Sequence, residues 1–331
     1  REAALDPKVK SIKITIYRLS KASHIASALI NAAKNGKKVL VQIELQARFD
    51  EENNINFAEQ LEAAGVQLIF GIPGLKVHSK ICVIERMHKS KNRRYGFVST
   101  GNFNESTAKI YTDYTLFTSN QKILKEVNKV FNFLEVSYRI KKYKHLIVSP
   151  HYTASTISKL IDNEIENHKK GLPSGISLKL NNITNYPLVD KLYEASQAGV
   201  KIKMIVRGIC CLIPGVKGLS ENITVKSVVG KFLEHPRVFI YENAGDKKIY
   251  LSSADFMTRN IENRVEVACP VYDEDLQQQI LDTFNLSWKD NTKARIVNQN
   301  PQNKMVLPQS GETAQRSQWT TYAYFKNKLN S

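Results

Sequence analysis

Hydrophobic and polar residues follow two alternating patterns along the first half of the chain. Residues 11–17 alternate polar and β-branched side chains as a strand does, whereas residues 24–34 place apolar side chains at helical spacing and stop before Gly36, a residue suited to a helix C-terminus. An apolar strand over residues 39–45 and a helix over residues 55–64 continue the order. Strands that alternate with helices indicate an α/β domain with a mixed, largely parallel sheet flanked by helices.

The same order of elements returns in the second half of the chain. The first half continues with predicted strands at residues 66–70, 81–84 and 95–99 and a helix at 122–138. The second half starts at residues 145–150, runs through a helix to about residue 170, repeats the strand-helix-strand order, and ends in a helix at 319–329. A basic connection over residues 139–144 separates the halves. Because domains usually hold roughly 100 to 200 residues, we expect two domains, 1–144 and 145–331, the second with a C-terminal helical tail.

Three short blocks occur twice along the chain, in the same order. The matching segments are 33–39 with 195–202, 74–80 with 232–237, and 99–103 with 252–256. Equivalent positions lie 163, 157 and 153 residues apart, a slow drift that small differences in loop length produce. We therefore expect two similar domains related by a pseudo-two-fold axis, with His78 and His235, which occupy matching positions, facing each other.

The net charge of the chain indicates which class of binding partner to expect. Lys and Arg number 48 against 31 Asp and Glu, and the net charge of +17 attracts a polyanion. Basic runs at residues 89–94 and 141–144 are typical of a solvated surface, and no aromatic-studded RNA-binding sequence or Cys/His finger accompanies them. The polyanion therefore need not carry bases, and we expect no nucleic acid.

Cysteine usage and hydropathy bear on location. The four cysteines form no C-x-x-C pair, which predicts reduced thiols in a cytosolic protein. No apolar run approaches the ~20 residues of a membrane-spanning helix. The chain begins at Arg1 without a methionine, so we expect a piece of a longer protein.

His78 and Lys80 carry the candidate chemistry of the first half. Alternate residues of a strand point to the same face, so the imidazole can attack phosphorus while the ammonium neutralises phosphate oxygens. Attack requires one free ring nitrogen, and the other should therefore donate to a carbonyl or carboxylate. Farther along, Thr100 and Gly101 precede Asn102 and Asn104, which we expect to orient the adjoining loop.

These H-x-K and G-x-N patterns resemble the phospholipase D superfamily. Its aspartate position after the lysine is occupied here by Glu85, and the second half has His235-x-Arg237, in which a guanidinium replaces the ammonium. Clustered cations without neutralising carboxylates predict a cleft that binds phosphate. The cations expected to line it are Arg18, Arg48, Lys80, Arg207 and Arg237.

Longer segments resemble one family more closely than the superfamily. They are residues 16–18, 44–54, 74–80, 100–104, 111–113, 206–211, 218–222 and 232–235. Over nearly the whole chain they are similar to the two C-terminal catalytic domains of polyphosphate kinase. The resemblance implies a kinase that reversibly transfers the γ-phosphoryl group of ATP to inorganic polyphosphate through a phosphohistidine, with Mg²⁺.

The resemblance also implies roles for individual residues. His78 matches the phosphorylated nucleophile, and His235 matches a second, nucleotide-side histidine that acts as acid or base. Tyr111 and Arg207 match contacts to the nucleotide phosphates, and Lys80, Arg237, Asn102 and Asn104 are expected beside the same phosphates. Arg18 and Arg48 match the positions assigned to magnesium. A guanidinium cannot ligate a cation, so we interpret that pair as clamping metal-bound phosphates.

Family members also have upstream N-terminal domains, one of which contacts adenine. For the full-length protein we expect those domains, ATP or ADP as substrate, a homo-oligomer, and a cytoplasmic location, peripheral at the inner membrane. Gln46, Lys231 and Phe97 depart from residues common in the family. Two alternatives stay open: a phospholipase D-type phosphodiesterase, and a paralogue that binds a polyanion without turnover.

Overall fold

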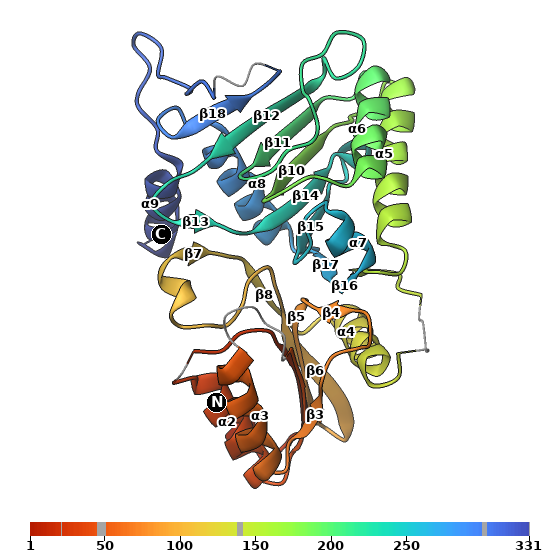
Figure 1. The fold of residues 1–331 in the computed structure, drawn as a ribbon, viewed down its shortest axis with the longest axis vertical. Coiled ribbons are helices and arrows are strands. Elements are labelled where there is room, and N and C mark those ends of the chain that lie inside the picture. Colours follow the sequence, from red (N-terminus) through yellow and green to blue (C-terminus); the bar gives the residue numbers. More distant parts are fainter. Residues whose placement is uncertain (21, 45–50, 138–141, 300–302, 331) are drawn as a thin grey trace. The chain divides into compact units, whose positions relative to one another are not determined.

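A computed structural model describes residues 1–331 except 21, 45–50, 138–141, 300–302 and 331 (Figure 1). The chain forms two compact units. Unit 1 consists of residues 1–109, 113–152 and 259–269, and unit 2 of residues 110–112, 153–258 and 270–331. Each unit thus contains a short segment from the other half of the sequence. The domain boundary that we expect between residues 144 and 145 stays a prediction.

Unit 1 is built on a six-stranded sheet in the order β3-β2-β1-β5-β6-β8. Its strands are β1 (Val9–Ile16), β2 (Lys38–Ile43), β3 (Gln67–Ile69), β5 (Lys80–His88), β6 (Lys91–Ser99) and β8 (Thr115–Thr118). Its helices are α1 (Glu2–Leu5), α2 (His24–Lys34), α3 (Glu51–Ala63), the short η1 (Thr107–Lys109) and α4 (Gln121–Glu135). Unit 1 also includes β9 (Ile147–Val148) and most of α7 (Thr258–Glu262) and of β17 (Val267–Pro270).

The expected mixed sheet is confirmed, but its parallel part is smaller than expected. Strand β1 pairs parallel with β2, and β2 with β3, whereas β5 runs antiparallel to both β1 and β6, and β6 antiparallel to β8. The physical reason is the link between β5 and β6. Two residues, Lys89 and Ser90, connect these strands, and so short a turn permits only antiparallel pairing.

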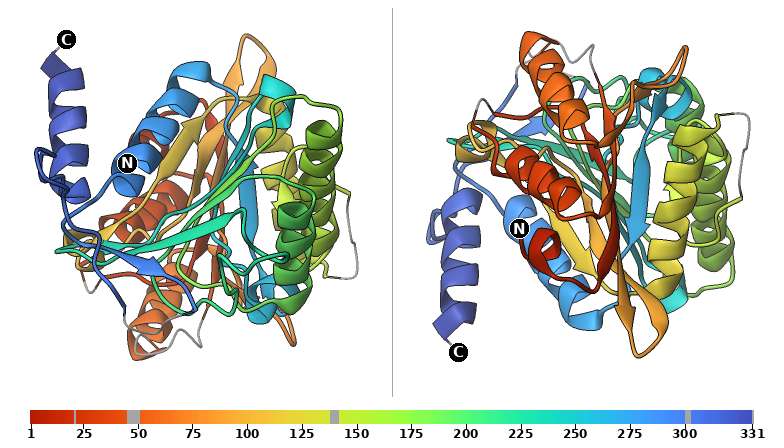
Figure 2. Two further views of the ribbon diagram at one scale, coloured as in Figure 1. Left: turned by 90° about the horizontal axis from the view of Figure 1, so that it is seen from above. Right: turned by 90° about the horizontal axis from the view of Figure 1, so that it is seen from below.

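Helices cover both faces of the first sheet, so its strands are apolar on both sides. Helices α2 and α3 lie on one face and α4 on the other (Figure 2). Successive residues of β5 alternate between the two cores: Cys82 packs with the α2 and α3 side, and Ile81 and Val83 with the α4 side. This two-sided burial fixes the strand register, because a shift by one residue would exchange the faces.

Unit 2 repeats the topology of unit 1. Its sheet contains the strands β12-β11-β10-β14-β15, with β18 antiparallel to β12 at the edge. The bounds are β10 (Ile176–Leu180), β11 (Ile202–Val206), β12 (Ile223–Val228), β14 (Arg237–Tyr241), β15 (Lys248–Ser252) and β18 (Ala294–Val297). The helices are α5 (Thr153–Lys169), α6 (Tyr186–Gln197), η2 (Asn243–Gly245), α8 (Glu274–Trp288) and α9 (Ser317–Asn330).

Pairing and glycine positions confirm the sequence repeat. Strands β10, β11 and β12 pair parallel and β14 runs antiparallel to β10, just as β1, β2, β3 and β5 do in unit 1. Gly36 after α2 and Gly199 after α6 both have positive φ, 74° and 100°, which favours glycine. Two similar α/β units are therefore confirmed, whereas a pseudo-two-fold relation concerns their mutual placement and stays a prediction.

Short strands from opposite halves of the sequence pair beside each repeated histidine. In unit 1, β4 (Lys76–Val77) pairs parallel with β16 (Arg264–Val265). In unit 2, β13 (Leu233–Glu234) pairs parallel with β7 (Tyr111–Thr112). No helix among the described residues is long and apolar enough to cross a membrane.

The turn between β5 and β6 is conformationally costly. Lys89 and Ser90 have φ values of 45° and 61°, and a two-residue turn with both residues left-handed favours Asn-Gly. We expect Lys89→Asn/Ser90→Gly to raise the free energy of unfolding by about 1 kcal/mol, since Asn and Gly tolerate positive φ better. Urea denaturation measures the change, with Lys89→Gln as the charge-matched control. Equal stability of the two variants would contradict the prediction.

Candidate active site

The backbone places His78 directly after the short strand β4. The amides of His78 and Ser79 both donate to the carbonyl of Val265, at 3.0 and 2.9 Å. Val265 ends β16, so the next residue along that segment, Glu266, lies beside the histidine. The pairing of β4 with β16 therefore brings together two side chains that are far apart in the sequence.

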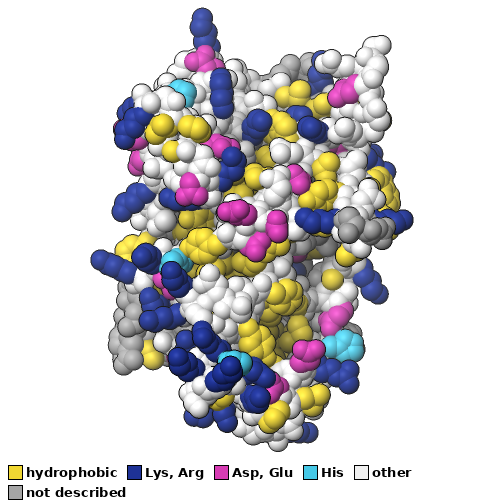
Figure 3. Space-filling model, turned by 180° about the vertical axis from the view of Figure 1, so that it is seen from behind, with side chains coloured by type: hydrophobic (Ala, Val, Ile, Leu, Met, Phe, Trp, Pro, Cys, Tyr) yellow, Lys and Arg dark blue, Asp and Glu magenta, His cyan; other side chains and the backbone are white. Residues whose placement is uncertain are grey.

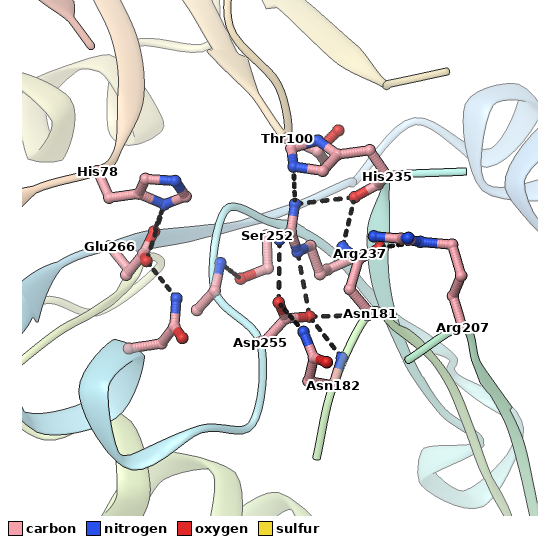
Figure 4. Close-up of polar contacts among 12 residues, drawn as sticks. His78, Thr100, Asn181, Asn182, Arg207, His235, Arg237, Ser252, Asp255 and Glu266 are labelled. Atoms are coloured by element: carbon pink, nitrogen blue, oxygen red, sulfur yellow. Dashed lines mark hydrogen bonds and ion pairs between the residues drawn. The ribbon is translucent and has the colours of Figure 1, made fainter. Parts of the chain in front are cut away.

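A buried carboxylate holds one ring nitrogen of His78. Nδ1 lies 2.9 Å from the Glu266 carboxylate, and the Asn260 amide donates to the same carboxylate at 2.6 Å (Figure 4). A carboxylate accepts, so Nδ1 carries the proton and Nε2 keeps its lone pair. The Tyr17 ring packs edge-on against the imidazole at 5.1 Å. The expectation that a carbonyl or carboxylate holds one nitrogen is confirmed.

The charge state of His78 follows from its burial. Burial lowers the pKa of His78 from 6.5 to about 3; Glu266 opposes this shift, and the ammonium of Lys80 adds to it. The imidazole is therefore neutral at physiological pH, as a nucleophile must be. Folding then favours the unprotonated ring, so this residue's contribution to stability falls as the pH drops from about 6.5 toward 3.

Lys80 and two other expected residues lie around one small cavity of unit 1. Lys80 is 3% exposed; its ammonium donates to the carbonyl of His78 and lies 5.3 Å from the Tyr17 ring centre. Arg18 and Asn102 line the same cavity, and the Asn102 Oδ1 atom is buried without a hydrogen-bond partner in the described part of the chain. The structure thus gathers two cations and an amide oxygen at one place.

Asn104 shapes a loop. Its side-chain oxygen accepts the amides of Ser106 and Thr107 at 3.1 and 3.0 Å, and this cap fixes the turn that follows the Thr-Gly-Asn block. Thr100 in that block donates to Asp113 at 2.6 Å. The expected orienting role of Asn104 agrees with these contacts, and its side-chain oxygen is already occupied by the chain.

His235 occupies in unit 2 the position that His78 occupies in unit 1. It follows β13, its amide donates to the carbonyl of Thr112 at 3.2 Å, and its ring lies 5.4 Å from that of Tyr111. The Arg237 Nη1 atom lies 2.8 Å from His235 Nε2. A guanidinium only donates, so Nε2 accepts and the ring proton of the neutral form resides on Nδ1. The Nε2 lone pair is therefore available on His78, whereas on His235 the corresponding lone pair accepts a hydrogen bond from Arg237.

Arg237 is neutralised by a carboxylate, contrary to the expectation for this cation. Its Nε and Nη2 atoms donate to Asp255 at 3.2 and 3.0 Å, and both side chains are buried. Asp255 also accepts the amides of Asn181 and Asn182 at 2.7 and 3.2 Å. With Nη1 donating to His235, most of the five guanidinium N–H groups are used, so Arg237 positions the histidine.

Arg207 adjoins this group (Figure 4). Its Nε donates to the Asn181 side-chain oxygen at 2.8 Å, and the Asn181 side-chain nitrogen, Nδ2, donates to the carbonyl of His235 at 3.1 Å. Burial, together with the positive charge of Arg237, lowers the pKa of the Arg207 guanidinium. A bound anion would offset both effects, which is consistent with the expected phosphate contact.

The residues that depart from the family pattern have structural partners. Glu85 accepts from Arg94 and Ser11 at 2.8 and 3.1 Å, within the sheet. Phe97 packs against Phe103 with ring centres 4.5 Å apart. Lys231 lies over the Trp319 ring at 5.7 Å. Two expected positions, Arg48 and Gln46, lie outside the described residues.

Sequence reasoning missed two acidic residues of this site, Glu266 and Asp255. Glu266 is the partner of His78, and Asp255 is the partner of Arg237, the cation beside His235. The repeat carried a signal for the first: Glu266 follows β16 as Asp113 follows β7, at the offset of 153 residues already found for the third block. Asp255 itself stands in the third block, opposite Asn102.

Comparisons with known proteins agree over almost the whole chain. The family model for polyphosphate kinase C-terminal domain 1 matches residues 1–140, and that for C-terminal domain 2 matches residues 146–318. The chain is 51% identical over 327 residues to a polyphosphate kinase of Vibrio parahaemolyticus serotype O3:K6 (strain RIMD 2210633) and 49% identical to one of Escherichia coli (strain K12). In both cases the match covers 99% of this chain and 47% of the relative.

Solved structures extend the likeness to the fold. A polyphosphate kinase from Porphyromonas gingivalis superposes with a TM-score of 0.92 at 40% identity, covering 99% of this chain and 50% of that one. A phosphatidylserine synthase from Haemophilus influenzae Rd KW20, at 13% identity, has a TM-score of 0.59 over 99% of this chain and 90% of its own, which shows a shared fold alone. The chain spans about half the length of the curated relatives it matches, and it belongs to the polyphosphate kinase family, of which it carries C-terminal domains 1 and 2.

Proposed function

We propose that this chain is the catalytic region of an ATP:polyphosphate phosphotransferase that works through a phosphohistidine at His78. The supporting observation is the contact between His78 Nδ1 and the buried Glu266 carboxylate, 2.9 Å long, which leaves Nε2 as the nucleophilic atom. Family membership supports the same reaction, with ATP and ADP as nucleotides and inorganic polyphosphate as the polymer.

The proposed transfer has two steps. First, Nε2 of His78 forms a bond to the γ-phosphorus of ATP while the bond from that phosphorus to the β,γ-bridging oxygen breaks, and ADP leaves. Then a terminal oxygen of polyphosphate attacks the same phosphorus, and the N–P bond breaks. The Nδ1 proton stays in its hydrogen bond to Glu266 throughout, so the carboxylate stabilises the positive charge on the phosphorylated ring.

The cations of unit 1 would supply electrostatic stabilisation. Lys80 and Arg18 line the small cavity with Asn102, and the transferred phosphoryl group carries its charge on oxygens that such donors can hold. Lys80 also fixes the backbone of His78 through its carbonyl. Charge stabilisation and positioning are therefore assigned to the same ammonium.

The described residues do not fit a magnesium site held by the protein. They include no group of three or more His, Cys, Asp or Glu that could hold a metal ion, and the guanidinium of Arg18, which the family resemblance places at magnesium, can only donate. We assign Arg18 to phosphate oxygens. Magnesium used by the reaction would arrive on the nucleotide, and no step here depends on it.

Unit 2 is assigned to the nucleotide. Arg207 and Tyr111 would contact its phosphates, and His235, held by Arg237, would move a proton. The upstream domains, a homo-oligomer and a cytoplasmic location peripheral to the inner membrane remain proposals of the same kind. Labelling the intact protein with γ-³²P-ATP and mapping the acid-labile phosphate by mass spectrometry tests the assignment. Label on a histidine other than His78 would reject it.

Glu266 offers a test of the mechanism that differs from loss of the nucleophile. We expect Glu266→Gln to slow phosphohistidine formation by about a hundredfold or more, because the ring loses its orienting carboxylate. The wild-type labelling rate should have no inflection near pH 6.5 from His78, since its pKa is lowered to about 3. Rapid-quench labelling between pH 5 and 8 measures both. Glu105→Gln, an exposed acid of the same unit, is the control, and a wild-type rate in Glu266→Gln would contradict the role.

A further inference from the structure

The tip of the β5–β6 hairpin in unit 1 carries a group of basic side chains that the proposed reaction does not use. It consists of Arg86, His88, Lys89, Lys91 and Arg93, and all but Arg86 are exposed. In Figure 3 Lys and Arg side chains gather over part of the surface of unit 1. We call these five residues the hairpin tip.

Strand register places four of these side chains on one face. Arg86 lies opposite Arg93 and His88 opposite Lys91, and cross-strand partners point to the same side of a sheet. Residues 86 and 88 also share a face because they alternate along the strand. Basic groups are therefore spaced by about 5 Å across the strands and about 6.6 Å along them.

Neutralising carboxylates are scarce on this face. Asp6 pairs with Arg86 at 2.6 Å, and Glu85, which points to the opposite face, pairs with Arg94. No acidic residue in the described ranges forms an ion pair with Lys89, Lys91 or Arg93. The outer part of the hairpin tip, which carries Lys89, Lys91 and Arg93, is therefore positively charged.

The hairpin tip is unfavourable for the isolated protein in two independent ways. Like-charged side chains directly across an antiparallel pair are destabilising, and here Arg86 lies directly opposite Arg93. The turn also holds Lys89 and Ser90 at positive φ, where neither residue is favoured. A bound polyanion would remove the first penalty, because each of its charges faces a cation.

The chemistry of the tip selects among polyanions. Residues 86–93 include no Phe, Tyr or Trp to stack on a nucleic-acid base, and no large apolar side chain is exposed there to enter a lipid surface. What remains is a ladder of cations suited to a flexible chain of phosphates. We propose that the hairpin tip is a second binding site for long-chain inorganic polyphosphate, separate from the transfer site; this rests on the proposed function.

The test compares two variants of the intact protein with equal loss of charge. Lys89→Gln/Lys91→Gln/Arg93→Gln removes three cations from the tip. Lys34→Gln/Lys122→Gln/Lys125→Gln removes three exposed lysines elsewhere in unit 1. Binding of long-chain polyphosphate and of tripolyphosphate is measured by calorimetry at several salt concentrations, and phosphohistidine formation from γ-³²P-ATP is measured in parallel.

The tip variant should bind long-chain polyphosphate about tenfold or more weakly than the control, and the slope of log Kd against log salt should fall by about 2 to 3. Tripolyphosphate binding and phosphohistidine formation should be unchanged. Equal binding of the long chain by both variants would overturn the proposal. Loss of binding to vesicles of phosphatidylglycerol and phosphatidylcholine, with polyphosphate binding intact, would overturn it in favour of a membrane. Absence of phosphohistidine in the wild type would instead reject the proposed function.

Discussion

His78→Ala in the intact protein is expected to abolish both the acid-labile phosphoprotein and polymer synthesis. The variant removes the only atom that the proposal assigns to attack on phosphorus, Nε2, which the contact with Glu266 leaves with its lone pair. Incubation with γ-³²P-ATP, followed by separation of protein-bound label from polymer, measures both products. His24→Ala, an exposed histidine of the same unit, serves as the control and should behave as wild type.

His235→Ala separates the two histidines in the same assay. It should slow turnover by about 10²- to 10⁴-fold but still permit labelling of the protein, because proton transfer rather than bond formation to phosphorus is its proposed task. Polymer synthesis at the wild-type rate by His78→Ala would mean that the phosphohistidine mechanism does not apply to this chain. Label retained in His78→Ala but lost in His235→Ala would reverse the two assignments.

Asp255→Ala is expected to lower the free energy of unfolding by about 3 to 5 kcal/mol. The change leaves the buried guanidinium of Arg237 without its counter-ion and removes the acceptor of the Asn181 and Asn182 amides. Urea denaturation followed by far-ultraviolet circular dichroism measures the loss. Asp162→Ala, which changes an exposed acid of the same unit, should alter stability by less than about 1 kcal/mol.

A double variant distinguishes a buried charge from a general packing defect. Arg237→Met/Asp255→Leu replaces the ion pair with apolar groups, which should recover a large part of the stability that Asp255→Ala loses. It should not recover catalysis, because Arg237 also donates to His235. A double variant as unstable as Asp255→Ala would indicate that the carboxylate acts through the backbone amides it accepts.

The sequence predicted elements best where local signals and packing agree. Helix α2 has the predicted bounds, His24–Lys34, because serine caps its start and glycine follows its end. The long strands β5 and β6 were predicted only in their apolar parts. Their outer halves, up to His88 and from Lys91, are polar, and they remain extended because each pairs with the other.

The site was harder to predict than the fold because its key contacts span large distances along the chain. The requirement that one nitrogen of His78 be held by an acceptor followed from chemistry alone. Glu266 as that acceptor did not, since 188 residues separate the pair. The sequence predicts an unpaired phosphate ligand at Arg237 because no residue near it in the sequence indicates Asp255. The pairing of β14 with β15 in the sheet brings the two side chains together.

The origin of β16 and Glu266 in the second half of the sequence has a consequence for biosynthesis. A ribosome releases residues in order, so His78 emerges long before its carboxylate partner has been translated. Strand β4 has no β16 to pair with during that interval, and His78, the proposed nucleophile, lacks the group that fixes its proton. A chain that stops early therefore carries the histidine without its partner. Competence for the proposed phosphorylation of His78 would thereby require translation beyond residue 266.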